Sequence, residues 1–348
     1  MMVLPSTVSV TRLPPDAIES WPLAADPRPD LAHAPQWADV IRRVYGHHPL
    51  YLGAEDAAGR RALLPAFIVR RPFIGDVVTS MPFLDGGGPT AASAELIESL
   101  ITRLVDEAAE AGARLVELRS PRRLGLTSPP PREHKVNLVL TLTPDADVAW
   151  RALDRGARSE IRKAERSGLS VECGGVEHVD AFYSVFASRM RELGSPVHAK
   201  SFFTTMVEAF RDRARVMIVR KGDTTIGGLV ALATGDVLTV PWASCLTEYR
   251  SLSPNMLLYW ETIRGACRDG FGRFDFGRST RGSGTYRFKR QWGAEEEPLF
   301  WYTIPVAVHR RTTRTFEAGK GTFIHLWRAL PLGVTRHLGP RVRKYLIQ

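Results

Sequence analysis

The sequence predicts an α/β protein in which one structural unit occurs twice. A strand with an internal proline, a loop, an amphipathic helix and a strand ending in Arg-Ser follow one another in that order at two places. Pro82 and Pro241 mark the first strand of each copy, and Arg119 and Arg278 mark the end of the second strand. Both pairs are 159 residues apart. This shared spacing indicates a duplication within 348 residues, a length that suits two domains.

Composition and charge restrict the class of protein. Hydrophobic residues make up 44% and charged residues 24% of the chain, as in soluble globular proteins. Residues 1–13 lack a secretory signal pattern, and no apolar run approaches the roughly 18 residues of a transmembrane helix. We therefore expect a cytoplasmic protein, with the inner face of the membrane as an alternative location. The net charge of +10 favours an anionic partner, and phosphate-bearing substrates, tRNA and membrane surfaces all remain candidates.

Metal and covalent chemistry find little support in the sequence. Cys173, Cys245 and Cys267 lie far apart without the spacing of a zinc site, so we expect packed free thiols. The histidines, including His47 and His48, show no metal-ligand spacing, and no metal is predicted. The GxSxG, HExxH and P-loop motifs are missing from the sequence, which excludes the hydrolase, metalloprotease and P-loop NTPase classes that depend on them.

Each copy of the repeat predicts a helix between its two strands. Apolar residues recur at helical spacing from Ile97 to Ala108 and again from Met256 to Cys267. The second half also predicts two earlier helices and an antiparallel meander, over residues 179–193, 202–210, 216–220, 225–233 and 237–244. A domain change after the strand at 136–142 gives three parts: an N-terminal domain at 1–145, a C-terminal domain at 146–306 and a basic amphipathic tail at 307–348.

Pro241 lies inside the last strand of the meander. Proline cannot donate a hydrogen bond to the sheet, so its position predicts a bulge that opens a slot beside the strand. Backbone N–H groups freed at Trp242, Ala243 or Ser244 would polarise an acyl carbonyl. An irregular edge strand is the alternative interpretation.

The residues before the second repeat's helix predict an anion site. Ser253 is expected to cap the helix and Pro254 to be its first residue. Helix N-termini attract phosphate through their N–H groups and dipole, which makes Arg250, Ser253 and Asn255 candidate cofactor-binding residues. Ordinary helix capping explains the same residues and is the simpler interpretation.

A polar segment from Arg278 to Gly293 follows the last strand of the repeat. Ligands commonly bind beyond the carboxyl ends of strands in α/β proteins, so we expect a functional loop here. Its cationic and aromatic side chains suit a phosphate or a carbonyl. The candidate substrate-binding residues of this loop are Arg278, Ser279, Tyr286 and Phe288, with Lys289 beside them.

Two further segments are basic. Arginines at steps of three or four predict one face of a helix made by Arg151, Arg155, Arg158, Arg162 and Arg166. A solvated helix face is the usual meaning, and a polyanion contact is the alternative. The tail also mixes arginines with apolar residues, and Pro331 and Pro340 interrupt any long helix. We expect a packed tail, with a peripheral contact to an anionic membrane as the alternative.

Four segments, taken in order, resemble the FemAB-like aminoacyl and acyl transferases of the GNAT-like superfamily. They are residues 158–165, 240–244, 255–260 and 274–293, and they are most similar to the branch associated with exosortase and PEP-CTERM sorting systems. The resemblance implies two tandem GNAT-like domains facing across a cleft. It also implies transfer of an acyl or aminoacyl group to an amine without a covalent enzyme intermediate. Phe288 and Lys289 match a Phe-Lys pair that lies near the reacting centre of FemAB enzymes.

The resemblance assigns roles to particular residues. Lys289 is expected to stabilise the carbonyl oxygen, together with Trp242 and Ser244 at the strand bulge, while Arg158 and Arg162 contact phosphate. We expect an N-acyl or aminoacyl transferase that acts on an amine of a peptidoglycan or exopolysaccharide precursor. No tightly bound cofactor is expected, and the donor is an acyl-CoA or an aminoacyl-tRNA. The alternative is a non-catalytic protein that binds an anionic glycan or lipid-linked intermediate; DNA is not an expected partner.

Overall fold

The computed structural model describes residues 8–21, 30–72, 74–91, 93–126, 129–306 and 320–347. The chain divides into two compact units. Unit 1 comprises Met1–Lys135, Pro298–Thr312 and Ile347–Gln348, and unit 2 comprises Val136–Glu297 and Thr313–Leu346.

This division differs from the expected domain boundaries in two places. The first unit ends at residue 135 rather than 145, and residues 298–306, expected in the second domain, group with the first. The cause of the second difference is strand β12 (Glu295–Pro305), which pairs with β5 (Leu115–Ser120) from Phe300 opposite Ser120 to Pro305 opposite Leu115. Of the expected tail, residues 307–319 lie outside the described part of the chain.

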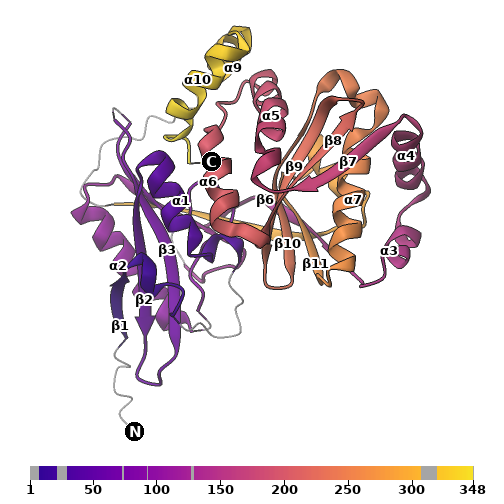
Figure 1. The fold of residues 1–348 in the computed structure, drawn as a ribbon. Helices are drawn as coiled ribbons and strands as arrows, with labels where there is room; N and C mark the ends of the chain where they lie inside the picture. Colours follow the sequence, from indigo (N-terminus) through magenta and orange to yellow (C-terminus); the bar gives the residue numbers. More distant parts are fainter. Residues whose placement is uncertain are drawn as a thin grey trace. The chain divides into compact units, whose positions relative to one another are not determined.

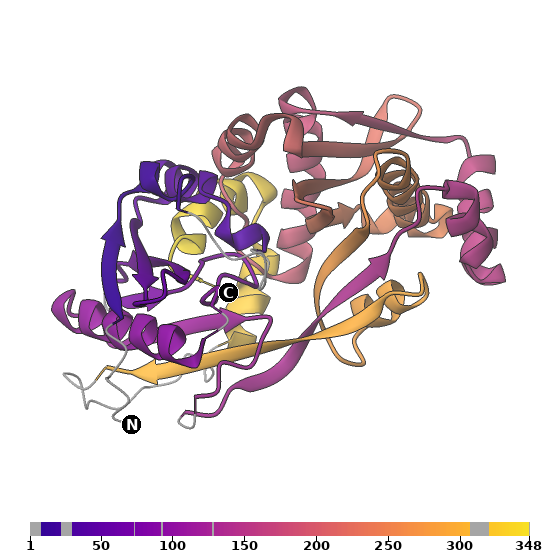
Figure 2. The ribbon, with the colours of Figure 1, turned by 90° about the horizontal axis from the view of Figure 1, so that it is seen from below.

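Unit 1 is built on a mixed sheet with the strand order β1-β2-β3-β4-β5-β12. Its other elements are β1 (Ser9–Leu13), η1 (Pro15–Ala17), η2 (Leu31–His33), α1 (Gln36–Tyr45), β2 (His48–Glu55), β3 (Arg61–Val69), β4 (Val77–Thr79) and α2 (Ala94–Glu110). Helix α2 packs on the sheet through a fully buried stripe, which contains Leu96, Leu100, Leu104 and Ala108 (Figures 1 and 2). The helix connects β4 to β5, which are parallel.

Unit 2 has the strand order β6-β11-β10-β9-β8-β7. Its strands are β6 (Arg132–Thr141), β7 (Leu169–Gly174), β8 (Ala214–Lys221), β9 (Thr224–Thr234), β10 (Val237–Cys245) and β11 (Arg273–Thr280). Its helices are α3 (Ala146–Ala152), α4 (Arg155–Arg166), η3 (Val176–His178), α5 (Val179–Leu193), α6 (Lys200–Phe210), η4 (Arg211–Arg213), η5 (Thr247–Leu252), α7 (Pro254–Arg268), α8 (Gly284–Arg290), α9 (Lys320–Ala329) and α10 (Leu332–Arg343). The helices predicted at 179–193 and 202–210, the helix from Met256 to Cys267 and the predicted meander are present.

Two faces of the unit 2 sheet carry different helices. Along β9, a side chain at Gly228 would approach Phe182 of α5 to 3.2 Å, whereas the next residue, Leu229, packs in the core that contains α7. Successive strand residues point to opposite faces, so α5 and α7 cover the sheet from opposite sides. Helix α7 connects β10 to β11, which are parallel (Figure 1).

The two strand-helix-strand units confirm the predicted repeat and refine its register, but β4 ends at Thr79, so Pro82 lies outside the strand, unlike Pro241 within β10. The parallel pairs run from Val77 and Leu115 to Thr79 and Glu117 in unit 1, and in unit 2 they end at Thr239 and Asp275. The paired residues of the first strands, Thr79 and Thr239, are one residue further apart than the 159 residues between the two prolines. The paired residues of the second strands, Glu117 and Asp275, are one residue closer than the 159 residues between the two arginines. The structural offset therefore differs by one residue, in opposite directions, from the single offset that the sequence landmarks share.

The basic stripe is divided between two helices, contrary to the prediction of one. Leu153 is extended, and Asp154 begins a new helix by accepting a hydrogen bond from the N–H of Ala157 (2.5 Å). The cap satisfies an N–H group that the first turn of a helix leaves unpaired, which favours a break over continuous periodicity. Arg151 therefore belongs to α3, and α4 carries Arg155, Arg158, Arg162 and Arg166.

The C-terminal helices pack on unit 2, as expected for a packed tail. Helices α9 and α10 contact α5 (Figure 1). Arg191 of α5 donates to the carbonyl of Leu330 (2.6 Å), and Arg336 of α10 donates to Ser184 Oγ (2.9 Å). Within the described residues, no helix is long and apolar enough to cross a membrane.

Candidate functional site

Strands β10 and β11 part within unit 2, as Pro241 predicted. Their parallel pairing ends at Thr239 and Asp275, although both strands continue. On its other side β10 shifts register against β9 between Thr239 and Trp242, which places an extra residue in β10 near Pro241. The β10–β11 ladder therefore ends at the bulge that Pro241 predicted, and the two strands continue beyond it without further pairing to each other among the described residues. We call residues 240–245 and 276–280, with the facing end of α8, the parted-strand site.

The two strands of the parted-strand site each carry a buried hydroxyl group. Ser244 is 6% exposed and Ser279 is 4% exposed. Neither Oγ has a hydrogen-bond partner among the described residues. A buried hydroxyl without a partner is unfavourable by about 1–3 kcal/mol, so such groups commonly meet a ligand or water. Both serines were predicted as site residues, and both lie where the ladder has ended.

Trp242 contributes its backbone to the site, while its side chain belongs to the core. The indole ring is 8% exposed and makes edge-on contacts with Phe202 and Phe203, at 5.5 Å between ring centroids in both cases. His198 contacts the same ring edge-on at 6.1 Å. The indole is therefore packed among aromatic rings of α6 and of the residues before it. Only the backbone N–H of Trp242 is left as a candidate for contacting a substrate.

The segment after β11, predicted as a loop, instead folds into α8. Ser283 caps this helix by accepting a hydrogen bond from the N–H of Tyr286 (3.2 Å). The cap and the arginines and lysine that follow it favour a helical turn. Lys289 is consequently on the buried side of α8, 8% exposed, and its Nζ donates to the carbonyl oxygens of Gly277 and Arg278, both at 2.8 Å.

These two hydrogen bonds place the ammonium group of Lys289 at the parted end of β11. They brace β11 where it no longer pairs with β10. The lysine therefore holds the backbone of β11 in place at residues 277 and 278. Asp275 adds to the bracing, because its Oδ1 accepts from the N–H of Gly277 (2.7 Å) and its Oδ2 from Asn137 Nδ2 (3.3 Å). Sequence reasoning missed Asp275 and Asn137; the Asp-x-Gly pattern of an Asx turn was the available signal.

Other predicted residues of α8 and β11 lie beside the site with their own contacts. Tyr286 Oη donates to Glu296, and this hydrogen bond raises the pKa of the tyrosine and lowers the pKa of Glu296. Phe288 is partly buried and contacts Tyr259 edge-on (5.2 Å). Arg278 is partly buried, and its carbonyl is one of the two that bind Lys289.

The candidate anion site before α7 differs from the expectation. Pro254 is the first helical residue as predicted, but Ser253 is left-handed (φ 57°) and does not cap the helix. Its Oγ donates to Glu160 of α4 instead, and Asn255 Oδ1 accepts from the thiol of Cys245 (2.7 Å). Arg250 is exposed on η5. A carboxylate bonded to Ser253 opposes the binding of a pyrophosphate at this helix end.

The predicted phosphate contacts, Arg158 and Arg162, both lie on α4. Arg162 is exposed, with its guanidinium 5.5 Å from the ring centroid of Trp150, and Arg158 is partly buried. Arginine stacked on an aromatic ring keeps its donors directed outward, as phosphate binding requires.

The three cysteines of the chain are free thiols. Burial raises the pKa of Cys245 to about 12, so this thiol stays protonated and is a poor nucleophile. Cys173 and Cys267 are also free, with Cys267 buried. Within the described ranges, no group of His, Cys, Asp and Glu side chains could hold a metal ion.

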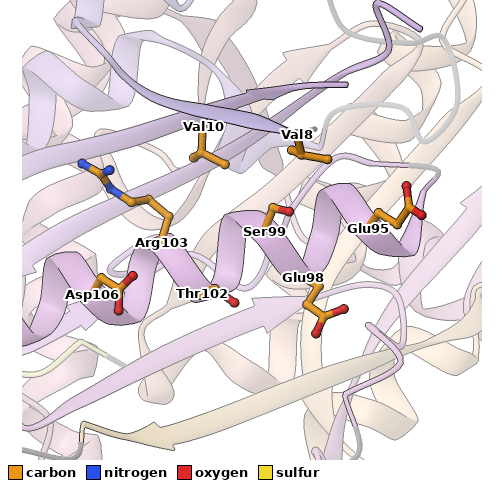
Figure 3. Close-up of a pocket in the computed structure, with 8 residues that line it drawn as sticks. All are labelled: Val8, Val10, Glu95, Glu98, Ser99, Thr102, Arg103 and Asp106. Atoms are coloured by element: carbon orange, nitrogen blue, oxygen red, sulfur yellow. The ribbon is translucent and has the colours of Figure 1, made fainter. Parts of the chain in front are cut away.

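A groove in unit 1 contains none of the residues predicted for the functional site. It has a volume of about 610 Å³ and runs between β1 and α2, lined by Val10, Glu95, Glu98 and Asp106 among others (Figure 3). Its open form and acidic lining are unsuited to an anionic partner. The parted-strand site therefore remains the stronger candidate.

Comparisons with known proteins agree with this choice of unit. Residues 151–290 match the acetyltransferase (GNAT) domain family. The matched segment begins in α3 and ends with α8, so it contains both parted strands and Lys289. No curated protein is significantly similar to the chain.

Solved structures are similar over most of the chain. FemX has a TM-score of 0.65 at 13% identity, covering 86% of this chain and 98% of that one. A tandem GNAT protein from the clavulanic acid biosynthesis pathway has a TM-score of 0.55 at 11% identity, and the match covers 86% of this chain and 99% of that one. A third similar structure is the C-terminal domain of a protein from Agrobacterium fabrum that is described as a lysylphosphatidylglycerol synthetase. It has a TM-score of 0.52 at 14% identity, and the match covers 83% of this chain and 91% of that one. The α/β (α+β) fold of tandem GNAT-like domains, expected from the sequence, is thereby confirmed.

Proposed function

We propose that this chain is an acyltransferase that moves an acyl or aminoacyl group to an amine of a cell-envelope precursor, using unit 2. The observation that carries the proposal is the parting of β10 and β11 beside two buried hydroxyls, Ser244 and Ser279, that have no partner in the described part of the chain. The GNAT match over the same elements and the fold of FemX and of the lysylphosphatidylglycerol synthetase domain support it. Peptidoglycan and exopolysaccharide precursors, the latter in an exosortase-associated system, are the proposed acceptors.

The proposed reaction is direct transfer between donor and acceptor. The nitrogen of the acceptor amine attacks the carbonyl carbon of a bound ester or thioester, a C–N bond forms, and the C–O or C–S bond to the donor breaks. The amine loses one proton and the leaving alcohol or thiol gains one. Negative charge that develops on the carbonyl oxygen is stabilised by N–H groups of β10 near Trp242 and Ser244 and by the ammonium of Lys289.

The donor is an acyl-CoA or an aminoacyl-tRNA, and the two are distinguished by their polar groups. CoA presents a pyrophosphate, for which Arg250, Ser253 and Asn255 are the proposed contacts. The bond from Ser253 to Glu160 weakens that arrangement and favours the tRNA ester, whose backbone phosphates Arg158 and Arg162 would bind. Both donors are cytoplasmic compounds, so the proposal places the protein in the cytoplasm.

A transfer assay tests the proposal. The full chain is incubated with labelled acyl-CoA or labelled aminoacyl-tRNA and with extracted envelope precursors, and label in the acceptor is measured. Lys289→Ala is expected to lower turnover by at least about tenfold, because it removes charge stabilisation beside the carbonyl. Lys221→Ala, at an exposed lysine that ends β8, is the matched control and should leave turnover unchanged.

The thermal unfolding temperature of both variants shows whether the fold is retained. Unchanged turnover in folded Lys289→Ala would remove the lysine from the mechanism. If no donor is consumed while precursors raise the unfolding temperature, the chain is the non-catalytic binding protein of the alternative interpretation.

A further inference from the structure

The C-terminal helices concentrate both exposed apolar side chains and positive charge. Residues 307–348 hold nine lysines and arginines against one acidic residue, Glu317, and so account for +8 of the chain's net +10. The stretch from residue 320 onward has no acidic residue. Helices α9 and α10 therefore supply no side-chain carboxylate to neutralise their own arginines, and this excess of positive charge attracts anions.

The inner faces of α9 and α10 are fixed to unit 2, which determines what the outer faces present. Arg343 donates to the buried His198 (Nε to Nε2, 3.0 Å), and Trp327 is 5% exposed. At Gly339 an added Cβ would lie 2.8 Å from Val197, so α10 approaches the rest of unit 2 closely there. These contacts leave the opposite sides of both helices facing outward.

Those outward sides are apolar to an unusual degree. Leu326 of α9 is 65% exposed, and Val334 and Leu338 of α10 are 38% and 39% exposed. Leu193, the last residue of α5, on which both helices pack, is 41% exposed. Among the described residues only three other large apolar side chains are as exposed, Ile74, Val148 and Val176.

Val334, Leu338 and Arg341 follow one another at steps of four and three, so they share one face of α10. All three are exposed, as is Arg328 of α9. Helices that combine exposed leucine or valine with arginine, and carry no carboxylate, are typical of peptides that lie in the interface of an anionic bilayer. A nucleic acid would use the arginines but would leave the leucines in water.

We propose that the outer surface of α9 and α10, with Leu193, docks on an anionic lipid surface. Leu326, Val334 and Leu338 enter the boundary between headgroups and acyl chains, and Arg328 and Arg341 bind the lipid phosphates. We call these five residues of α9 and α10 the docking face. This inference is independent of the proposed function, because it concerns a surface that includes none of the site residues.

Vesicle sedimentation tests the docking face. The full chain is mixed with phosphatidylcholine vesicles that either contain or lack phosphatidylglycerol, and the bound fraction is measured. Wild-type protein should bind only the vesicles with phosphatidylglycerol, and binding should weaken as salt is raised. The triple variant Leu326→Ser, Val334→Ser, Leu338→Ser should lose at least about tenfold in affinity, and Arg328→Gln with Arg341→Gln about fivefold for each arginine.

The matched control is Val148→Ser with Val176→Ser, which removes two equally exposed valines elsewhere in unit 2 and should bind as the wild type does. All substituted residues are exposed, and thermal unfolding checks that the variants remain folded. Absence of binding to phosphatidylglycerol vesicles overturns the proposal. Binding to bulk tRNA that depends on the arginines but not on Leu326, Val334 and Leu338 also overturns it, because the face would then be a nucleic-acid contact.

Discussion

The two copies of the strand-helix-strand unit treat the ends of their parallel strands in opposite ways. In unit 1, Arg119 follows the last pair and is fully buried: it binds Glu117 (2.6 Å), the carbonyl of Leu84 (2.5 Å) and the carbonyl of Ile347. Its guanidinium also lies 4.8 Å from the ring centroid of Trp301. In unit 2 Arg278, the counterpart of Arg119 in the sequence repeat, is only partly buried, and the hydroxyls of Ser244 and Ser279 lack partners among the described residues.

The difference contrasts a strand end held by a buried arginine with one that carries the residues of the candidate site. At the unit 1 strand end Ser80 is bonded internally, since its Oγ accepts from the N–H of Arg119 (3.0 Å) and its N–H donates to the carbonyl of Glu117 (2.9 Å). The buried Thr79 Oγ1 beside it has no partner among the described residues. At the unit 2 strand end the Oγ atoms of Ser244 and Ser279 have no partner among the described residues. The sequence already indicated this inequality, because only the second copy has a cationic segment after its last strand.

The largest expected effect contrasts the two arginines. Arg119→Met leaves Glu117 buried without its partner and should lower the free energy of unfolding by about 3–5 kcal/mol. Arg278→Met, at a partly exposed position, should cost about 1 kcal/mol or less. Urea denaturation of each variant provides the comparison. Equal costs would mean that the two strand ends are stabilised alike.

A smaller effect separates the buried serines. Ser80→Ala removes an acceptor from a buried backbone N–H and should cost about 1–2 kcal/mol of unfolding free energy. Ser244→Ala and Ser279→Ala remove hydroxyls without partners and should cost less, or stabilise the protein slightly. Only the latter two should impair transfer in the labelled assay. Transfer that survives both substitutions would argue against a substrate contact at the parted-strand site.

The smallest expected effect is pH dependence, and it has opposite signs in the two units. In unit 1 the buried His33 has Nδ1 2.9 Å from Asp30 Oδ1 and Nε2 2.7 Å from the Gly88 carbonyl. Burial opposes protonation, but Asp30 and these hydrogen bonds prevail and raise the pKa of His33. Its stabilisation is therefore present below the unfolded pKa of about 6.5 and is lost as pH rises through the folded pKa.

In unit 2 the buried His198 behaves in the reverse sense. Burial, and then the charge of Arg343, lower its pKa well below 6.5. The folded state thus holds His198 neutral, and stability falls as pH drops below about 6.5, where the unfolded chain takes up the proton. Urea denaturation between mildly acidic and mildly basic pH should show that His33→Gln flattens the basic side and His198→Gln the acidic side. A change on the wrong side would refute these assignments.

Local patterns predicted much of the fold. The helix expected at 179–193 has those bounds in the structure, and the bulge near Pro241 is where the missing N–H of proline placed it. Features set by distant contacts were not predictable. An arginine in a strand indicates exposure, and the burial of Arg119 depends on Trp301 and Ile347, far away in the sequence. Similarly, nothing local shows that Lys289 binds strand carbonyls.

Gly277 of β11 lies close to Val240 of β10 at the point where the two strands stop pairing. Its φ of 72° suits glycine, and an added Cβ would lie 3.1 Å from the carbonyl oxygen of Val240 on the neighbouring strand. Even a methyl group at this position would act as a wedge that pushes the strands further apart. If the proposed transfer takes place between these strands, the bulk of acyl group that fits there is a property that one substitution, Gly277→Ala, would change.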